Sequence, residues 1–147
     1  AEMLCGELAR RYAGSDIDIV LGPAVGGIII AYEVARQLGC KAIFAEREDG
    51  RLCLRRGFSI RAGERVLVVE DVVTTGGSVK EVIELVRAAA GELVGIGLLV
   101  DRSGGKVSFG VRTEALLSLS IPTYRPDECP LCLTGVPISQ RGSRGLY

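Results

Sequence analysis

Two adjacent carboxylates followed by hydroxyls and glycines mark the segment RVLVVEDVVTTGGSVKEVIELV, residues 65–86. Glu70 and Asp71 come directly after an apolar run. A loop that contains Thr74, Thr75, Gly76, Gly77 and Ser78 then leads into a helical pattern. Hydroxyls and the N–H groups of a helix N-terminus bind phosphate, and glycines let the backbone approach it. Because carboxylates repel phosphate, the two acids must serve another part of the ligand, such as sugar hydroxyls or a bound magnesium ion. The segment therefore predicts a phosphosugar site.

A simpler interpretation is a strand–turn–helix unit whose Thr and Ser side chains only cap the helix. Capping accounts for one hydroxyl and gives no reason for the paired acids. The order G-x-x-x-x-G-K-[ST] is absent, so the segment is not a Walker A loop.

A second glycine-rich segment, GPAVGG at residues 22–27, also follows a predicted strand and opens a helix. Its backbone N–H groups predict a second anion site. The alternative is close packing of the helix on the sheet through Gly26 and Gly27. Arginines gather between these two segments, at Arg47, Arg51, Arg55, Arg56, Arg61 and Arg65. They are candidates for anion binding, and their alternative role is a solvated hairpin face.

The elements that must position these residues alternate along the chain. Apolar, β-branched runs predict strands at Ile17–Gly22, Lys41–Glu46, Arg65–Glu70 and Leu93–Val100. Helical patterns cover Gly26–Gly39 and Gly77–Ala90, the second closed by Gly91, and Asp49-Gly50 predicts the turn of a small flexible hairpin between Glu48 and Phe58. This alternation predicts an α/β fold with a mostly parallel central sheet flanked by helices, which binds ligands at the carboxyl ends of its strands. We expect a single domain over residues 1–147, with an irregular tail at 121–147.

Composition excludes several classes of protein. With 18 basic and 18 acidic residues, the chain is not a general nucleic-acid binder, and no apolar run is long enough to cross a membrane. Histidine is absent, which removes His-based acid–base catalysis. The five cysteines do not form the pattern of a secreted disulfide framework, so we expect a cytoplasmic protein.

The segment VLVVEDVVTTGGSV resembles the 5-phosphoribosyl-1-pyrophosphate (PRPP) motif of type I phosphoribosyltransferases. Together with GPAVGGIIIAYEVARQLG, FAEREDG, LRRGF and LVDRSGGK, it resembles the orotate phosphoribosyltransferase family over about Asp16 to Ser143. The resemblance implies the type I phosphoribosyltransferase fold. It also implies transfer of phosphoribose from PRPP to orotate with Mg²⁺ as cofactor, which gives orotidine 5′-monophosphate and pyrophosphate.

The resemblance also implies a role for each matching residue. Glu70 and Asp71 hold the ribose hydroxyls, directly or through magnesium-bound water, and no side chain is expected to ligate the metal directly. Thr74 and Arg102 bind orotate, the arginine by pairing with its carboxylate. The 5′-phosphate is wrapped by Val72, Val73, Thr74, Thr75, Gly76, Gly77 and Ser78.

The pyrophosphate half of PRPP is expected at Ala24, Val25, Gly26 and Gly27, with Arg47 and Arg51 supplying charge. Glu70, Asp71 and Arg47 are the candidate catalytic residues. The family resemblance, and a basic loop that lacks an evident anion in its own subunit, predict a homodimer with shared active sites.

Two features leave alternatives open. About fifteen residues precede Asp16, so we expect the N-terminal segment that helps relatives bind the base to be short or truncated. A regulatory module that senses PRPP without catalysis, or an enzyme that uses a purine base, are the competing hypotheses. Cys129 and Cys132 form a C-x-x-C pair, for which packing as small apolar residues is expected over a shared zinc site or a disulfide.

Overall fold

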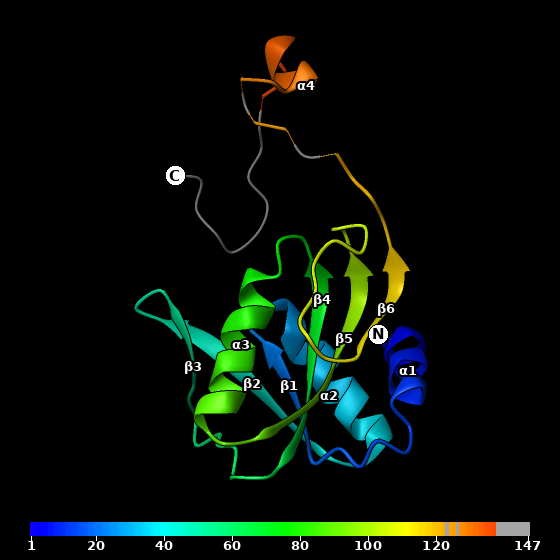
Figure 1. Ribbon diagram of the computed structural model, residues 1–147, viewed down its shortest axis with the longest axis vertical. Helices are drawn as coiled ribbons and strands as arrows, with labels where there is room; N and C mark the ends of the chain where they lie inside the picture. Colours follow the sequence, from blue (N-terminus) through cyan, green and yellow to red (C-terminus); the bar gives the residue numbers. More distant parts are fainter. Residues whose placement is uncertain (123, 126, 138–147) are drawn as a thin grey trace.

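A six-stranded sheet forms the centre of the molecule (Figure 1). The computed structural model describes residues 1–122, 124, 125 and 127–137. The strand order is β3-β2-β1-β4-β5-β6, and all neighbouring pairs are parallel except β2 with β3. The strands are β1 (Ile19–Pro23), β2 (Lys41–Glu48), β3 (Arg51–Leu54), β4 (Arg65–Val73), β5 (Glu92–Asp101) and β6 (Thr113–Ser118).

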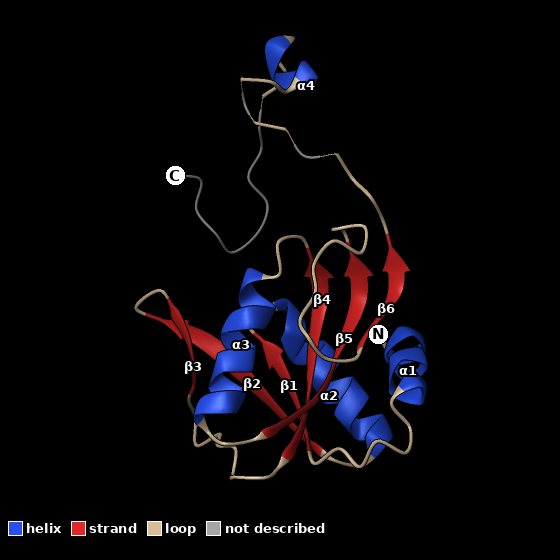
Figure 2. Cartoon of the chain, viewed as in Figure 1, coloured by secondary structure: helices blue, strands red, loops and turns tan. Residues whose placement is uncertain are grey.

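Helices cover both faces of this sheet, as the sequence predicts (Figure 2). One face carries α3, and the other carries α1 and α2, while the short α4 lies beyond the carboxyl ends of the strands. The helices are α1 (Glu2–Arg11), α2 (Gly26–Leu38), α3 (Gly77–Ala88) and α4 (Pro130–Leu133). In the described residues no helix is long and apolar enough to cross a membrane.

The side-chain alternation of β4 supplies both hydrophobic cores. Val66 and Val68 belong to the core under α3, whereas Leu67 and Val69 belong to the core under α1 and α2. Because successive side chains of a strand point to opposite faces, a buried central strand needs apolar residues at every position. This requirement explains the uninterrupted apolar run that precedes the acidic pair.

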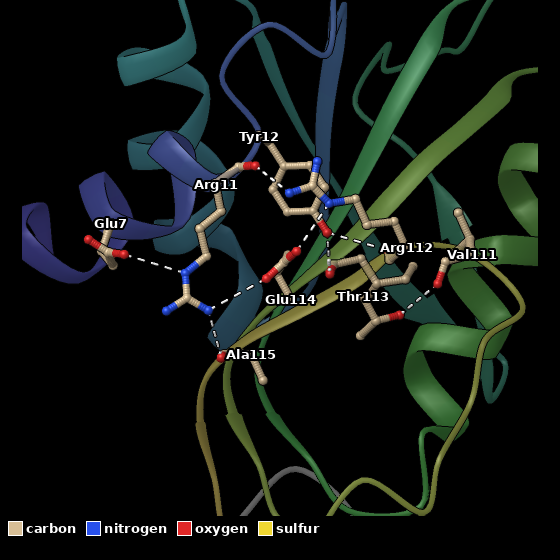
Figure 3. A network of polar contacts seen from close by, with 9 residues as sticks. Glu7, Arg11, Tyr12, Val111, Arg112, Thr113, Glu114 and Ala115 are labelled. Carbon is tan, nitrogen blue, oxygen red and sulfur yellow. Dashed lines mark hydrogen bonds and ion pairs between the residues drawn. The ribbon is translucent and has the colours of Figure 1, made fainter.

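The sequence analysis did not predict α1 or β6, which stabilise each other. Figure 3 shows that Arg11 donates a hydrogen bond to the carbonyl of Ala115, at 2.9 Å. The Tyr12 hydroxyl donates to the carbonyl of Ile96, at 2.8 Å, and the Arg112 guanidinium lies 4.8 Å from the Tyr12 ring centre. Burial raises the pKa of Tyr12 to about 12. These contacts join residues that lie far apart in the sequence, so local periodicity did not indicate them.

Several predicted boundaries also differ from the structure. The acidic pair lies inside β4, which continues to Val73 because Val72 and Val73 pair with Val100 and Asp101 of β5. Helix α3 ends at Ala88, and Ala90 rather than Gly91 takes the first positive φ after it, 55°. The hairpin prediction is confirmed, since β2 and β3 are antiparallel and Asp49 and Gly50 both have positive φ, at 49° and 78°.

Candidate active site

The strand order reverses between β1 and β4, which are neighbours in the sheet but not in the chain. The connection after β1 leads to α2 on one face, and the connection after β4 leads to α3 on the other. Loops that leave in opposite directions open a crevice at the carboxyl ends of the two strands, where α/β sheets of this kind bind ligands. The two glycine-rich segments singled out in the sequence are these two loops.

One pocket in this crevice brings together most of the residues predicted for ribose and pyrophosphate. It has a volume of about 370 Å³. Its lining consists of Pro23, Ala24, Val25, Gly26, Arg47, Leu52, Glu70, Asp71, Val72 and Ser78. The candidate catalytic residues therefore share one pocket, although they come from β2 and β4.

The two carboxylates of β4 are oriented by the backbone around them. Glu70 is buried, with 7% of its surface exposed, and accepts a hydrogen bond from the N–H of Asp71 at 3.1 Å. Asp71 accepts one from the N–H of Val72 at 2.7 Å. The alternation of β4 places Asp71 on the α2 face, where its carboxylate lies against Gly26, and a Cβ added to Gly26 would overlap it.

The sequence left two roles open for the glycines of the loop at residues 24–27, anion binding and close packing of helix on sheet, and the structure assigns one glycine to each side. Gly27 is buried and packs on Gly22, where an added Cβ would meet backbone atoms at 3.1 Å, so its role is close packing of helix on sheet. Gly26 is exposed and contacts the carboxylate of Asp71, so it lies on the pocket side. Helix α2 begins at Gly26 with no side-chain cap, so no side chain satisfies its first N–H groups.

A second pocket, of about 680 Å³, contains the residues predicted to bind orotate. Thr74, Thr75 and Arg102 lie in its lining together with Ser103, Lys106, Val107, Ser120, Ile121 and Pro122. The backbone N–H of Arg102 donates to the carbonyl of Val73 at 2.8 Å, which ties the arginine to the end of β4. The sequence analysis assigned no role to Lys106 or Ser120, although a lysine in a glycine-rich loop after a strand was a usable signal for the first.

Where the loop from β4 leads into α3, the N-cap position is occupied by a glycine and not by a residue with a hydroxyl group. Gly76 is the N-cap of α3, with φ of 76°, and no side chain caps this helix. The interpretation of Thr74, Thr75 and Ser78 as capping residues is therefore wrong. An added Cβ at Gly76 would lie 2.8 Å from Val107 and 3.0 Å from Phe109, so this loop packs directly against the loop that follows Arg102.

Asp101 holds the Arg102 loop in shape. Its carboxylate accepts hydrogen bonds from the N–H of Ser103 at 2.7 Å, the N–H of Gly105 at 2.9 Å and the hydroxyl of Ser118 at 3.3 Å. Burial by itself raises the pKa of Asp101, but these hydrogen bonds outweigh it and lower the pKa below its usual value. The sequence analysis did not single out this residue.

The basic hairpin is paired within its own chain, contrary to the expectation that it lacks an anion there. Arg47 binds Glu81 of α3 at 2.8 and 3.0 Å, and this carboxylate raises the pKa of the arginine. Arg55 and Arg56 lie within 3.7 Å and 3.0 Å of Glu46, which favours the solvated hairpin face for both.

The structure separates Arg51 and Val73 from the residues predicted to act with them. Arg51 begins β3 and does not line either of the two pockets described above. Val73 is buried and lines a separate cavity formed by β4, β5, β6 and the loop at residues 105–109, so its carbonyl, rather than its side chain, contributes to the site.

The described residues offer few candidate ligands for a magnesium ion. They contain no cluster of three or more His, Cys, Asp or Glu side chains that forms a metal cage. Glu70 and Asp71 provide two carboxylates, and Mg²⁺ is commonly bound by one or two carboxylates together with substrate phosphates. Cys129 and Cys132 are free and half-buried at α4, outside the two hydrophobic cores, so the packing role expected for them is not supported.

Comparison with known proteins places this geometry in a family. Residues 1–108 match the model of the phosphoribosyl transferase domain. The chain is 62% identical over 146 residues to an orotate phosphoribosyltransferase of Caldanaerobacter subterraneus subsp. tengcongensis. The matched region covers 99% of this chain and 77% of the relative. It is 60% identical, with the same coverage, to an orotate phosphoribosyltransferase of Pelotomaculum thermopropionicum.

Solved structures agree on the fold. An orotate phosphoribosyltransferase from Aeropyrum pernix superposes with a TM-score of 0.65 at 26% identity, covering 80% of this chain and 71% of that one. An adenine phosphoribosyltransferase from Thermoanaerobacter pseudethanolicus superposes with a TM-score of 0.70 at 19% identity, covering 80% of this chain and 79% of that one. At this low identity the likeness supports the fold alone. With its motifs gathered in one crevice and such identity over nearly its full length, the chain belongs to the orotate phosphoribosyltransferase family.

Proposed function

We propose that this chain transfers the 5-phosphoribosyl group of PRPP to orotate, giving orotidine 5′-monophosphate and pyrophosphate for pyrimidine synthesis. The observation that carries the proposal is the crevice at the β1/β4 switch point, with two carboxylates, two glycine-rich loops and Arg102 around it. The names of the close relatives support orotate as the base.

The proposed reaction needs no protein nucleophile. The bond between C1 of the ribose and the pyrophosphate oxygen breaks, and the leaving pyrophosphate takes the electron pair. A ring nitrogen of orotate then forms the new bond to C1. The task of the protein is to hold both substrates in line and to stabilise developing charge, which fits a chain that contains no histidine.

Each side chain has a proposed task in this scheme. Glu70 and Asp71 hold the ribose hydroxyls and face the positive charge that grows on the ribose ring. The backbone of residues 24–27 and the guanidinium of Arg47 hold the pyrophosphate, while residues 72–78 hold the 5′-phosphate. When bound, a magnesium ion neutralises part of the pyrophosphate charge. Arg102 pairs with the orotate carboxylate, since a guanidinium presents the fork that a carboxylate matches.

We further propose a homodimer in the cytoplasm. The family supports the dimer, whereas the ion pairs of the hairpin remove the argument from an unpaired basic loop. The odd number and scattered spacing of the five cysteines do not form a secreted disulfide framework, which supports a reducing compartment.

The test is release of pyrophosphate from PRPP and magnesium in the presence of orotate, adenine or guanine. Orotate alone is expected to support turnover, and Asp71→Asn is expected to lower it by at least about 100-fold while the protein stays folded. Turnover with a purine would favour the purine enzyme, because purines carry no carboxylate for Arg102. PRPP binding without turnover on any base would favour the sensor module.

A further inference from the structure

The carboxylate of Glu81 joins two parts of the site that are far apart in the sequence. Its Oε1 accepts a hydrogen bond from Nη2 of Arg47 at 2.8 Å, and its Oε2 accepts one from Nη1 at 3.0 Å. The same Oε2 accepts the backbone N–H of Leu52 at 3.4 Å. One side chain on α3 therefore contacts both strands of the hairpin formed by β2 and β3.

These contacts fix the direction of the Arg47 side chain. An arginine has several rotatable bonds, and ordering it without partners costs free energy. The two-point contact with Glu81 uses the planar fork of the guanidinium, and Nη1 also donates to the carbonyl of Gly50 at 2.6 Å. Held in this way, Arg47 lines the same pocket as Glu70, Asp71 and the loop at residues 24–26.

The position of Glu81 on α3 links this arrangement to the phosphate-binding loop. Ser78, in the first turn of α3, lines the pocket, and Glu81 lies one helical turn further on, on the same side of the helix. The helix that begins at the predicted 5′-phosphate site thus also orients the arginine predicted at the pyrophosphate site. Both Arg47 and Glu81 are about one third exposed, 33% and 38%, so the pair lies at the pocket edge where a ligand can reach it.

We propose that Glu81 is a positioning residue that holds Arg47 in place for the pyrophosphate group. This inference rests on the proposed function for the identity of the ligand, but it makes a separate statement about how the side chains act together. Glu81 itself does not touch the ligand in this proposal, because a carboxylate repels pyrophosphate.

A double-mutant cycle on pyrophosphate affinity tests the proposal. Sodium pyrophosphate with magnesium chloride is titrated calorimetrically into wild type, Glu81→Ala, Arg47→Ala and the double variant. Glu81→Ala is expected to weaken binding by about 10-fold, or about 1.4 kcal/mol. In the Arg47→Ala background, removal of Glu81 is expected to cause little further loss, because the proposal has Glu81 affect the ligand mainly through Arg47.

Glu84→Ala is the matched control, since it removes a carboxylate from the same helix that pairs with Arg87 at 2.7 Å and touches no part of the hairpin pair. Its pyrophosphate affinity should equal that of wild type. Steady-state kinetics should show a raised KM for PRPP in Glu81→Ala and an unchanged KM for orotate. Glu81→Gln, which keeps an acceptor for the Leu52 N–H, should fall between wild type and Glu81→Ala and serves if the alanine variant does not fold.

Unchanged or tighter pyrophosphate binding in Glu81→Ala would overturn the proposal, as would an equal loss in Glu84→Ala. Fully additive losses in the double variant would overturn it too. The titration does not depend on turnover. Absence of orotate-dependent turnover in wild type would therefore refute the proposed function, whereas the coupling between Glu81 and Arg47 would still be measured.

Discussion

At the scale of single residues, the site depends on very short distances between backbone and side chain. Gly26 shows this best, because its backbone lies against the carboxylate of Asp71 and leaves no room for a Cβ. The carboxylate of Asp71 occupies the space that a side chain at this position would need, and Arg47 is the basic residue that lines the pocket.

Replacement of Gly26 by alanine is therefore expected to impair the site. The added methyl group must push either Asp71 or the loop out of place, and overpacking of this kind costs about 1–3 kcal/mol. PRPP-dependent turnover should fall by at least about 10-fold. Steady-state kinetics and thermal unfolding check this expectation.

Gly6→Ala is the control for the Gly26 variant. An added Cβ at Gly6 meets the end of the flexible Gln37 side chain at 2.9 Å, which can move aside. This variant should keep wild-type turnover. If Gly26→Ala also kept full turnover, the close contact with Asp71 would have no part in catalysis.

Arg102 makes a second prediction at this scale. Removal of one partner of a charge-assisted pair costs about 2–3 kcal/mol, so Arg102→Ala should lower orotate affinity by roughly 30- to 150-fold. Arg102→Lys should recover only part of this loss, because lysine lacks the planar fork. Separate titrations with orotate and PRPP measure both effects.

The two titrations matter because Arg102 shares its pocket with Thr74 and Thr75. A larger loss for orotate than for PRPP would support base recognition. Equal losses would mean that Arg102 serves the phosphate or the shape of the loop, and an unchanged orotate affinity would contradict the assignment.

At the scale of elements, the loop between β5 and β6 is organised by one buried carboxylate. Asp101 accepts hydrogen bonds from Ser103, Gly105 and Ser118, and the loop it shapes carries Arg102 and packs on Gly76. The hairpin of β2 and β3 is held in a comparable way by Glu81 of α3. In both cases an acid on a strand or helix holds a neighbouring segment that carries an arginine of the candidate site.

The lowered pKa of Asp101 predicts a dependence of stability on pH. Its folded-state pKa lies below the unfolded value of about 3.9, so the ionised group stabilises the fold above about pH 4. This contribution should be lost as the pH falls below about 4 and through the folded-state pKa. Asp101→Asn should cost about 1–3 kcal/mol at pH 7, and the difference from wild type should shrink on acidification.

Urea unfolding of both proteins at pH 7 and in steps from pH 4 to 2.5 measures this difference. The matched control is Asp127→Asn, because Asp127 is an exposed carboxylate on the tail. The control should show no such pH-dependent gap. A gap for Asp101→Asn that stayed constant down to the lowest pH would mean that its ionised form does not stabilise the loop.

At the scale of the whole molecule, we expect the two copies of the proposed homodimer to meet at an apolar stripe along the start of α2. Val25, the N-cap of α2, is 74% exposed, and Ile29 and Tyr32 on the helix are 64% and 61% exposed. The three residues follow one another at helical spacing, and Val25 also lines the candidate pocket. A second copy covering this stripe would place two active sites near the dimer interface. The expected mass in solution is twice the 15.6 kDa of one chain.

Light scattering of wild type and Ile29→Glu tests this arrangement. The charged side chain should convert the dimer to a folded monomer, as checked by circular dichroism, because a buried unpaired carboxylate opposes association. A wild-type protein that is monomeric and fully active would contradict the shared active sites. A dimer that survives Ile29→Glu would place the interface on another face.

The sequence by itself determined the local parts of this protein. The buried strand before Glu70 and Asp71, the Asp49-Gly50 turn and the glycine end of α2 at Gly39 all follow from periodicity and backbone preference, which act over a few residues. The family motif and its two loops were recognisable for the same reason. They are contiguous in the chain, so the sequence also indicated the fold class and the kind of ligand.

Only the tertiary structure decided which side chains act together. The pairing of Arg47 with Glu81, the contact of Gly26 with Asp71 and the packing of Gly76 on Val107 join residues that lie far apart in the chain. The extension of β4 past its acids depends on its partner β5, and α1 and β6 depend on each other. Such contacts form where the sheet brings strand ends and loops together, and residue type and local spacing carry no record of that geometry.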